Sequence, residues 1–360
     1  MWLLLTCLVV VFQGTSTSAQ SSKIDTDAID TVVKKEMRDQ KIVGLAIAII
    51  GKGKVLYSKG YGFADLEEKT EVGTSTVFNW ASNSKPVMAI AAMQLVESGD
   101  LDLDASVSDY VPNLPAEWKD ITTRHLLCHQ SGIPHYRNGK VVPSGTEFTP
   151  EEELDPMNTI HRFTKSPLLF TPGTKSEYSS YAYILLTAVV QAAGKKPIAQ
   201  QLTERITEPL KMDSFQLDMP FADQPNWSKG YRIVNGKPVE LADEPHAWKH
   251  GAGAYKSSID DFAKFTIGMM KSRLVKSRTS SKMWKGQQLA SEEKTVRGLG
   301  VTVSGKGDKL KVSHGGSQSE VTTRMVMYPK KRHGIVVLCN TDDINIGRVT
   351  TNVYKVLVAN

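Results

Sequence analysis

The sequence is poor in cysteine and has a single long apolar run. Its 360 residues include three cysteines, too few for a scaffold held together by disulfide bonds. The apolar run, residues 2–12, carries no charge and would span roughly 16 Å as a helix, about half of a bilayer core. No other segment is long enough to cross a membrane, which excludes a protein with several membrane spans.

Basic residues are not concentrated in one block interleaved with aromatic residues, although the formal net charge is +6. The sequence therefore gives no indication of a nucleic-acid partner. The most basic segment, residues 271–285, has six Lys or Arg and no acid. We interpret it as a solvated surface, with a contact to nucleic acid or phospholipid as the alternative. An apolar content of 40 % and a charged content of 23 % are typical of a globular protein.

Small polar residues follow the N-terminal apolar run and end in Thr17-Ser18-Ala19-Gln20. The length of the run and its small-residue exit predict a secretory signal peptide, residues 1–19, and a secreted, extracellular protein. A mitochondrial presequence would need spaced arginines, and none precedes Arg38. A mitochondrial location is the alternative.

Removal of the signal peptide would leave Cys128 and Cys339, which a secreted chain could join in one disulfide. Cys128 lies in an expected helix and Cys339 in an apolar run typical of a buried strand. We therefore favour two separately buried thiols. The sequence also contains one N-glycosylation sequon, Asn226-Trp227-Ser228.

The apolar spacing predicts strands near both ends of the chain and helices in the middle. Expected helices cover 26–39, 82–99, 181–193 and 346–358, and expected strands cover 44–50, 55–61, 299–303, 310–313, 322–328 and 334–339. This order indicates an α+β fold, with an antiparallel sheet built from N- and C-terminal segments, flanked by helices, and an inserted helical subdomain. The expected domain spans 24–360, with a sheet subdomain at about 24–75 and 250–360 and a helical subdomain at about 76–249.

Ser82 and Lys85 open the clearest of the expected helices. Residues three apart share a helix face, so the lysine amine can reach the serine hydroxyl. The positive helix end and burial both lower the pKa of a lysine, and a neutral lysine can serve as a general base. The same spacing recurs in Ser291-Glu-Glu-Lys294, so an N-cap serine beside a surface lysine is the alternative.

Five motifs in a fixed order give this pair its context. They are Val77-Phe-Asn-Trp-Ala-Ser-Asn-Ser-Lys85, Ile121-Thr-Thr-Arg-His-Leu-Leu-Cys-His-Gln-Ser-Gly132, Phe170-Thr-Pro-Gly173 with Glu177-Tyr-Ser-Ser180, Gly251-Ala-Gly253 with Asp260, and Ser313-His-Gly-Gly-Ser317. Through them the chain resembles the β-lactamase/transpeptidase-like family of serine β-lactamases and penicillin-binding proteins, especially class C β-lactamases and related esterases. Within that family it is most similar to the animal LACTB-like serine hydrolases.

The resemblance implies a role for each matching residue. Ser82 would attack a carbonyl and form an acyl-enzyme, while Lys85 and Tyr178 would share the proton transfers. His314 would orient groups or donate a proton beside Tyr178, or it would contact a substrate carboxylate. The backbone N–H groups of Ser82 and Ser317 would form the oxyanion hole. The structural alternatives are a half-buried aromatic residue for Tyr178 and a strand histidine satisfied by the backbone for His314.

The substrate-binding positions implied by the resemblance are Ser180, Gly315 and Gly316. Ser180 stands where many family members have an asparagine, and a serine is shorter and offers only a hydroxyl group. His314 offers a weaker and pH-dependent positive charge than the lysine of many members. Both differences argue against efficient β-lactam hydrolysis, and Glu320 near the mouth of the site could alter substrate choice.

No metal or cofactor is expected. His125, His129 and His135 could suggest a metal site, because the first two have a helical ligand spacing, but Leu126 stands where a zinc protease has its glutamate. An α/β-hydrolase would need Gly-x-Ser-x-Gly, and the best match, Gly315-Gly-Ser-Gln-Ser319, fails at its last position.

Three functions remain open. The favoured one is a secreted serine hydrolase that cleaves esters or peptide amides through an acyl-Ser82 intermediate. The alternatives are a β-lactam or D-amino-acid peptide hydrolase, and a catalytically weak relative with a binding or self-assembly role. The expected partner is a small ester or peptide substrate, without nucleic acid or a membrane span, and a homo-oligomer stays open.

Overall fold

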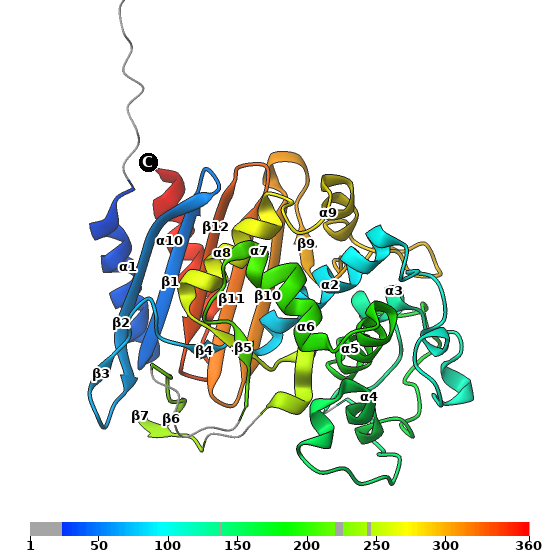
Figure 1. Cartoon of the computed structure of the whole chain (residues 1–360). Coiled ribbons are helices and arrows are strands. Elements are labelled where there is room, and N and C mark those ends of the chain that lie inside the picture. Colours follow the sequence, from blue (N-terminus) through cyan, green and yellow to red (C-terminus); the bar gives the residue numbers. More distant parts are fainter. Residues whose placement is uncertain (1–23, 137, 220–225, 243–245, 360) are drawn as a thin grey trace, which may run out of the picture.

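A seven-stranded antiparallel sheet forms the centre of the molecule (Figure 1), as a computed structural model of residues 24–136, 138–219, 226–242 and 246–359 shows. The strand order is β3-β2-β1-β12-β11-β10-β9. The strands are β1 (Gly44–Gly51), β2 (Lys54–Asp65), β3 (Thr70–Glu71), β9 (Thr302–Ser304), β10 (Lys311–Gln318), β11 (Val321–Tyr328) and β12 (His333–Cys339). Because β1 pairs with β12, with Leu45 opposite Cys339, the two ends of the chain build one sheet.

Helices cover both faces of this sheet. Helices α1 (Thr26–Gln40) and α10 (Ile346–Ala359) pack side by side on one face (Figure 1), while α8 (Ile259–Met270) lies on the other. Along β1, Leu45 and its i+2 neighbours belong to the cluster under α1 and α10, and Ala46 and its i+2 neighbours belong to the main core. Strand β1 is therefore apolar at every position, because side chains alternate between two covered faces.

The middle of the chain adds a body of helices beside the sheet (Figure 1). These are α2 (Ser84–Ser98), α3 (Thr123–Leu127), α4 (Pro156–Thr159), α5 (Tyr181–Gly194) and α6 (Ile198–Leu202). The short helix α7 (Glu208–Leu210) contacts α8, and α9 (Ser277–Met283) follows α8 in the chain. Helix α5 is buried over most of its length and packs against α2 and α3. It ends at Lys195, which takes the left-handed conformation at φ 53°. The remaining strands are β4 (Phe78–Asn79), β5 (Gln216–Leu217), β6 (Tyr231–Val234), β7 (Lys237–Glu240) and β8 (Tyr255–Ser257).

The expected fold class is confirmed, and most expected elements lie within two residues of the observed ones. One expected strand, 299–303, is largely wrong, since β9 begins only at Thr302. Gly300 has φ +81° and donates its N–H to the Leu127 carbonyl at 3.1 Å, and that conformation interrupts an extended strand. The expected β10 was too short, because the strand continues through the glycines to Gln318.

Cys128 and Cys339 are both buried and unpaired, which confirms the expectation of two separate thiols. Burial raises the pKa of each thiol to about 12, so neither is a reactive thiolate at neutral pH. None of the helices in the described ranges has the length and apolar character needed to cross a membrane. The expected signal peptide lies outside the described residues, and the proposed subdomain boundaries stay a prediction.

Candidate active site

Ser82 lies in a single tight turn, Ala81–Asn83, that leads directly into α2. Ala81 has φ +47°, a left-handed conformation that costs a non-glycine residue about 1–2 kcal/mol. The side-chain oxygen of Asn79 accepts the Ala81 N–H at 2.6 Å and offsets this cost. The Asn79 amide in turn donates to Asp218 at 2.6 Å, so a buried hydrogen-bond chain holds the strained turn.

A second anchor for the turn comes from the central sheet. Thr323 on β11 donates its hydroxyl to the Trp80 carbonyl at 2.8 Å and accepts from the Asn83 side-chain amide at 2.8 Å. These bonds hold the Trp80 backbone and the Asn83 side chain, on either side of Ser82. The serine side chain is half-buried, and its position is therefore set by residues that lie far away in the sequence.

Lys85 reaches Ser82 from the first turn of α2. Its Nζ lies 3.1 Å from Ser82 Oγ and 3.1 Å from Ser180 Oγ, and it donates to the Ala252 carbonyl at 2.6 Å. The side chain is fully buried. Burial, and to a lesser extent the nearby Lys249 ammonium, hold the pKa of Lys85 well below its ordinary value. This shift favours the neutral form that a general base requires.

Tyr178 completes a cluster with Ser82 and Lys85. The Lys85 Nζ lies 4.9 Å from the centre of the Tyr178 ring. Burial raises the pKa of Tyr178 to about 12, although hydrogen bonds with Ser82 and Ser180 oppose this rise. The phenol keeps its proton at neutral pH, so its hydroxyl can donate to the neighbouring oxygens.

His314 lies on β10, behind Tyr178, with the two ring centres 6.5 Å apart. Its Nδ1 lies 2.8 Å from the Gly315 carbonyl; a carbonyl only accepts, so Nδ1 carries the hydrogen. Burial, assisted by Lys85, lowers the pKa of His314 to about 3. A neutral, buried imidazole fits an orienting role better than a contact with a substrate carboxylate.

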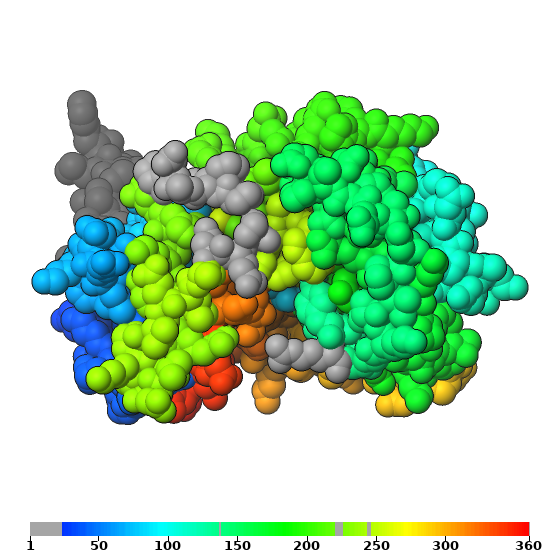
Figure 2. Space-filling view, turned by 90° about the horizontal axis from the view of Figure 1, so that it is seen from below, coloured from blue at the N-terminus to red at the C-terminus, as the bar shows by residue number. Residues whose placement is uncertain are grey.

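A cavity of about 780 Å³ opens above Ser82. The sequence-predicted residues among those that line it are Ser82, Tyr178, Ser180, Gly315, Gly316 and Ser317. His314 and Glu320 are not among the described lining residues. Figure 2, seen from below, shows the hollow between the orange C-terminal strands and the green helical part of the chain.

Strand β10 forms the wall of this cavity beside Ser82. Strand β9 pairs only with residues 311–313, so the following residues of β10 have an open edge toward the turn. A Cβ at Gly316 would lie 2.5 Å from the Trp80 carbonyl oxygen and 3.1 Å from the Ala81 Cβ. Only a glycine lets the strand approach this closely, and the approach brings the Ser317 backbone to the side of Ser82.

The three histidines considered as metal ligands have other partners. His125 Nδ1 accepts the Thr122 N–H in a capping box, His129 Nδ1 accepts from the Ser179 N–H, and His135 Nδ1 accepts from the Ser180 N–H. Within the described ranges no cluster of His, Cys, Asp or Glu has the arrangement of a metal site.

Sequence reasoning missed Lys249 and Tyr136, which also line the cavity. Lys249 Nζ lies 3.0 Å from His246 Nδ1. Neither Lys249 nor Tyr136 belongs to a sequence pattern that indicates a functional site. Glu320, expected at the mouth, is instead buried with 3 % exposure, and its Cβ occupies the space beside Gly230. The missing side chain of Gly230 makes room for it, which the local sequence does not reveal.

Comparison with known proteins places this geometry in a family. The family model described as Beta-lactamase matches residues 29–360. The chain belongs to the β-lactamase family. The expectation of a β-lactamase/transpeptidase-like serine hydrolase family is therefore confirmed, whereas the LACTB-like subgroup is not tested.

Two curated proteins illustrate what this chain is similar to. Protein flp of Staphylococcus aureus (strain NCTC 8325 / PS 47) is 25 % identical over 348 residues, which cover 92 % of this chain and 66 % of that protein. Esterase EstB of Burkholderia gladioli is 32 % identical over 231 residues, or 60 % of this chain and 57 % of EstB. This chain thus spans less than two thirds of the length of either relative.

Solved structures support the fold. The octameric penicillin-binding protein homologue from Pyrococcus abyssi superposes with a TM-score of 0.78 at 24 % identity, covering 93 % of this chain and 78 % of that one. At this identity the likeness shows that the two chains share the fold.

Proposed function

We propose that this protein is a serine hydrolase that cleaves esters or peptide amides through an acyl-Ser82 intermediate. The observation that carries the proposal is the 3.1 Å contact between Lys85 Nζ and Ser82 Oγ, in which the lysine is fully buried and the serine lines an open cavity. A buried amine with a lowered pKa next to a hydroxyl at a cavity is the arrangement of an activated nucleophile.

The proposed acylation step follows from the hydrogen bonds around Ser82. The neutral Lys85 amine takes the Ser82 proton while Oγ forms a bond to the substrate carbonyl carbon. The tetrahedral intermediate then loses its alcohol or amine, and the Tyr178 hydroxyl gives that leaving group a proton and regains one from the Lys85 ammonium. Water attacks the acyl-enzyme by the reverse route and releases the acid.

The oxyanion hole of this mechanism consists of the backbone N–H groups of Ser82 and Ser317. The proposal is supported by the open edge of β10 and by the close approach of Gly316 to the Ala81–Asn83 turn. A donor of this kind stabilises a transition state by about 3–4 kcal/mol. The cavity walls at Ser180, Gly315 and Gly316 would hold the acyl group.

Esters and simple amides are the proposed substrates, rather than β-lactams or D-amino-acid peptides. The Ser180 hydroxyl is hydrogen-bonded to Lys85, and a neutral His314 supplies no positive charge for a substrate carboxylate. The similarity to esterase EstB also favours esters. Secretion after cleavage at Ala19 and membership of the LACTB-like subgroup belong to this proposal as well.

A fluorophosphonate probe tests the proposal directly. We expect one adduct by intact mass, located on Ser82 by peptide mapping and absent in Ser82→Ala. The matched control is Ser84→Ala, the next serine on the same segment, whose hydroxyl accepts from the Tyr255 N–H rather than from Lys85. A folded protein that does not react would overturn the proposal and leave a binding or self-assembly role.

A substrate panel separates the reaction classes. Hydrolysis of short-chain nitrophenyl esters or peptide anilides that depends on Ser82 would support the proposed class. Rapid turnover of a chromogenic cephalosporin or a D-alanyl-D-alanine peptide, with slow turnover of esters, would favour the alternative. In that case Ser180 would have to replace the usual asparagine in function.

A further inference from the structure

Three segments that are far apart in the sequence meet at the end of the sheet opposite the cavity. The β1–β2 turn (51–54) and the β11–β12 turn (329–332) lie together, since Ile50 pairs with Gly334 and the Gly53 N–H donates to the Arg332 carbonyl at 3.0 Å. The segment after α8 joins them, because a Cβ at Gly53 would lie 2.5 Å from Lys271 Cε.

This end of the molecule is strongly basic. The exposed cations of residues 51–54, 271–273 and 329–332, here called the hairpin-tip patch, are Lys52, Lys54, Arg273, Lys330, Lys331 and Arg332. Residues 51–56, 270–276 and 328–333 contain no acid. Within the described part of the chain, none of these six side chains forms an ion pair with a carboxylate.

The cations are close enough to repel one another. Lys271 lies half-buried under the patch; partial burial, together with repulsion from Arg273 and Arg332, lowers its pKa. Gathering like charges without acids costs free energy in the isolated protein. That cost is relieved when an anionic partner covers the patch.

Two exposed aliphatic side chains lie within the same patch. Val55 is 40 % exposed and Leu56 is 36 % exposed, directly after Lys54 on β2. Nucleic-acid sites pair cations with aromatic residues for base stacking, and the patch has no exposed aromatic side chain among its described residues. Cations around small aliphatic groups are instead typical of a surface that rests on lipid headgroups.

We propose that this end of the protein binds an anionic phospholipid surface, with the hairpin-tip patch on the headgroups and Val55 at the acyl boundary. The cavity stays accessible in this arrangement. Ser317 and Thr322 pair at the other end of β10 and β11, roughly 20 Å along the strands from Tyr328 at 3.3 Å per residue. Figure 1 shows the turns at the top, and Figure 2 shows the cavity from below.

Vesicle cosedimentation of the full chain tests the proposal. Each basic residue near an anionic bilayer strengthens binding roughly fivefold. Lys54→Gln combined with Lys330→Gln and Lys331→Gln should therefore weaken binding to vesicles that contain phosphatidylglycerol about 100-fold. All variants keep the same N-terminus, so its apolar run contributes equally to each.

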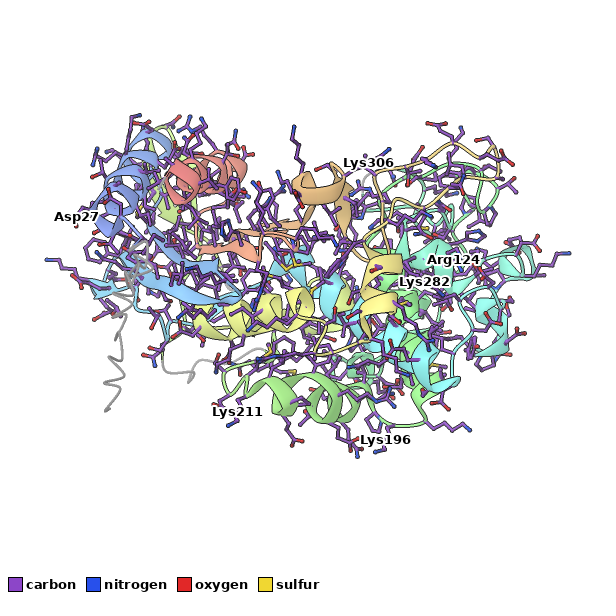
Figure 3. All side chains as sticks on the ribbon, turned by 90° about the horizontal axis from the view of Figure 1, so that it is seen from above. Asp27, Arg124, Lys196, Lys211, Lys282 and Lys306 are labelled. Atoms are coloured by element: carbon purple, nitrogen blue, oxygen red, sulfur yellow. The ribbon has the colours of Figure 1, made fainter. Side chains whose placement is uncertain are left out.

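The matched control removes three lysines elsewhere: Lys119, Lys196 and Lys211, each changed to glutamine. Lys196 and Lys211 flank the green helices at the margin opposite Lys306 in Figure 3. This triple variant has the same net charge as the test variant and should bind almost as tightly as the wild type. Equal losses in both triple variants would show that net charge alone drives binding, which would overturn the proposal.

A conservative change separates lipid from other polyanions. Val55→Thr keeps the side-chain shape and should weaken binding to phosphatidylglycerol vesicles roughly fourfold, with binding to heparin unchanged. Two results would contradict a lipid site: equal binding of the wild type to phosphatidylcholine and phosphatidylglycerol vesicles, or binding to duplex DNA as tight as to vesicles with no effect of Val55→Thr. Equal melting temperatures would show that the variants are folded.

Discussion

Replacing Lys85 by methionine should lower activity and raise the free energy of unfolding. The pH dependence of the gain in stability should show that it comes from removing a buried amine with a lowered pKa. Methionine has a similar length but cannot take the Ser82 proton. Loss of a general base typically costs 10²–10⁴-fold in rate. We therefore expect probe labelling and ester turnover of Lys85→Met to fall by about 10²–10⁴-fold.

The stability effect follows from the buried amine. Burial holds the pKa of Lys85 well below the ordinary value of 10.5. Between the folded-state pKa and 10.5, the unfolded chain carries a proton on this amine and the folded protein does not. The free energy of unfolding of the wild type therefore rises with pH in this range by about 1.4 kcal/mol per pH unit.

The methionine variant lacks this proton uptake. Its stability relative to the wild type should be greatest at low pH within this range and should shrink by about 1.4 kcal/mol per unit as the pH rises toward 10.5. Urea denaturation of both proteins at several pH values measures the difference, and the exposed Lys211→Met serves as the control for replacing a surface lysine by methionine. A constant difference between Lys85→Met and the wild type would mean that folded Lys85 keeps its proton, and its role as base would be refuted.

Three further changes test the neighbours of Ser82. Tyr178→Phe should lower kcat by about 10²–10⁴-fold with little change in KM, as steady-state ester hydrolysis would show; an unchanged kcat would remove Tyr178 from the proton relay. Thr323→Val should leave Trp80 and Asn83 with unsatisfied buried groups, lower the free energy of unfolding by about 2–6 kcal/mol and slow the labelling of Ser82; normal labelling would show that Thr323 does not position the serine. Because the pKa of His314 is lowered to about 3, wild-type activity should show no His314-dependent titration from about pH 5 to about pH 8, and a titration that disappears in His314→Asn would contradict this.

The elements near the chain ends could be predicted because their signals are local. The helix expected over 26–39 is observed as Thr26–Gln40, and the one expected over 346–358 as Ile346–Ala359. In both, apolar residues repeat with the helical period on a face that packs against the sheet. Helix α8 was not predicted, although it has a capping serine, Ser258, and a buried apolar face. The sequence analysis used this segment only for Asp260, as part of the motif that begins at Gly251.

Contacts between distant residues could not be predicted from local patterns. The bond from Asn79 to Asp218, and the bonds of Thr323 with Trp80 and Asn83, join residues 139 to 243 positions apart. Lys249 reaches the cavity from a segment without a motif. The basic segment 271–285, interpreted from the sequence as a solvated surface, supplies only Arg273 to the hairpin-tip patch, and the two turns that supply the rest belong to other parts of the chain.

Two Ser-x-x-Lys pairs in this chain show why spacing alone does not make a base. Ser291 and Lys294 have the same separation as Ser82 and Lys85, yet both are exposed and lie outside any helix, so nothing turns their side chains to one face. Lys85 is different because Ser180 and Ala252, 95 and 167 positions away, bind its amine in a dry interior. The chemistry proposed for Ser82 thus depends on the fold, which buries Lys85 away from water. A Ser-x-x-Lys motif can supply a general base only where distant residues such as Ser180 and Ala252 surround its lysine.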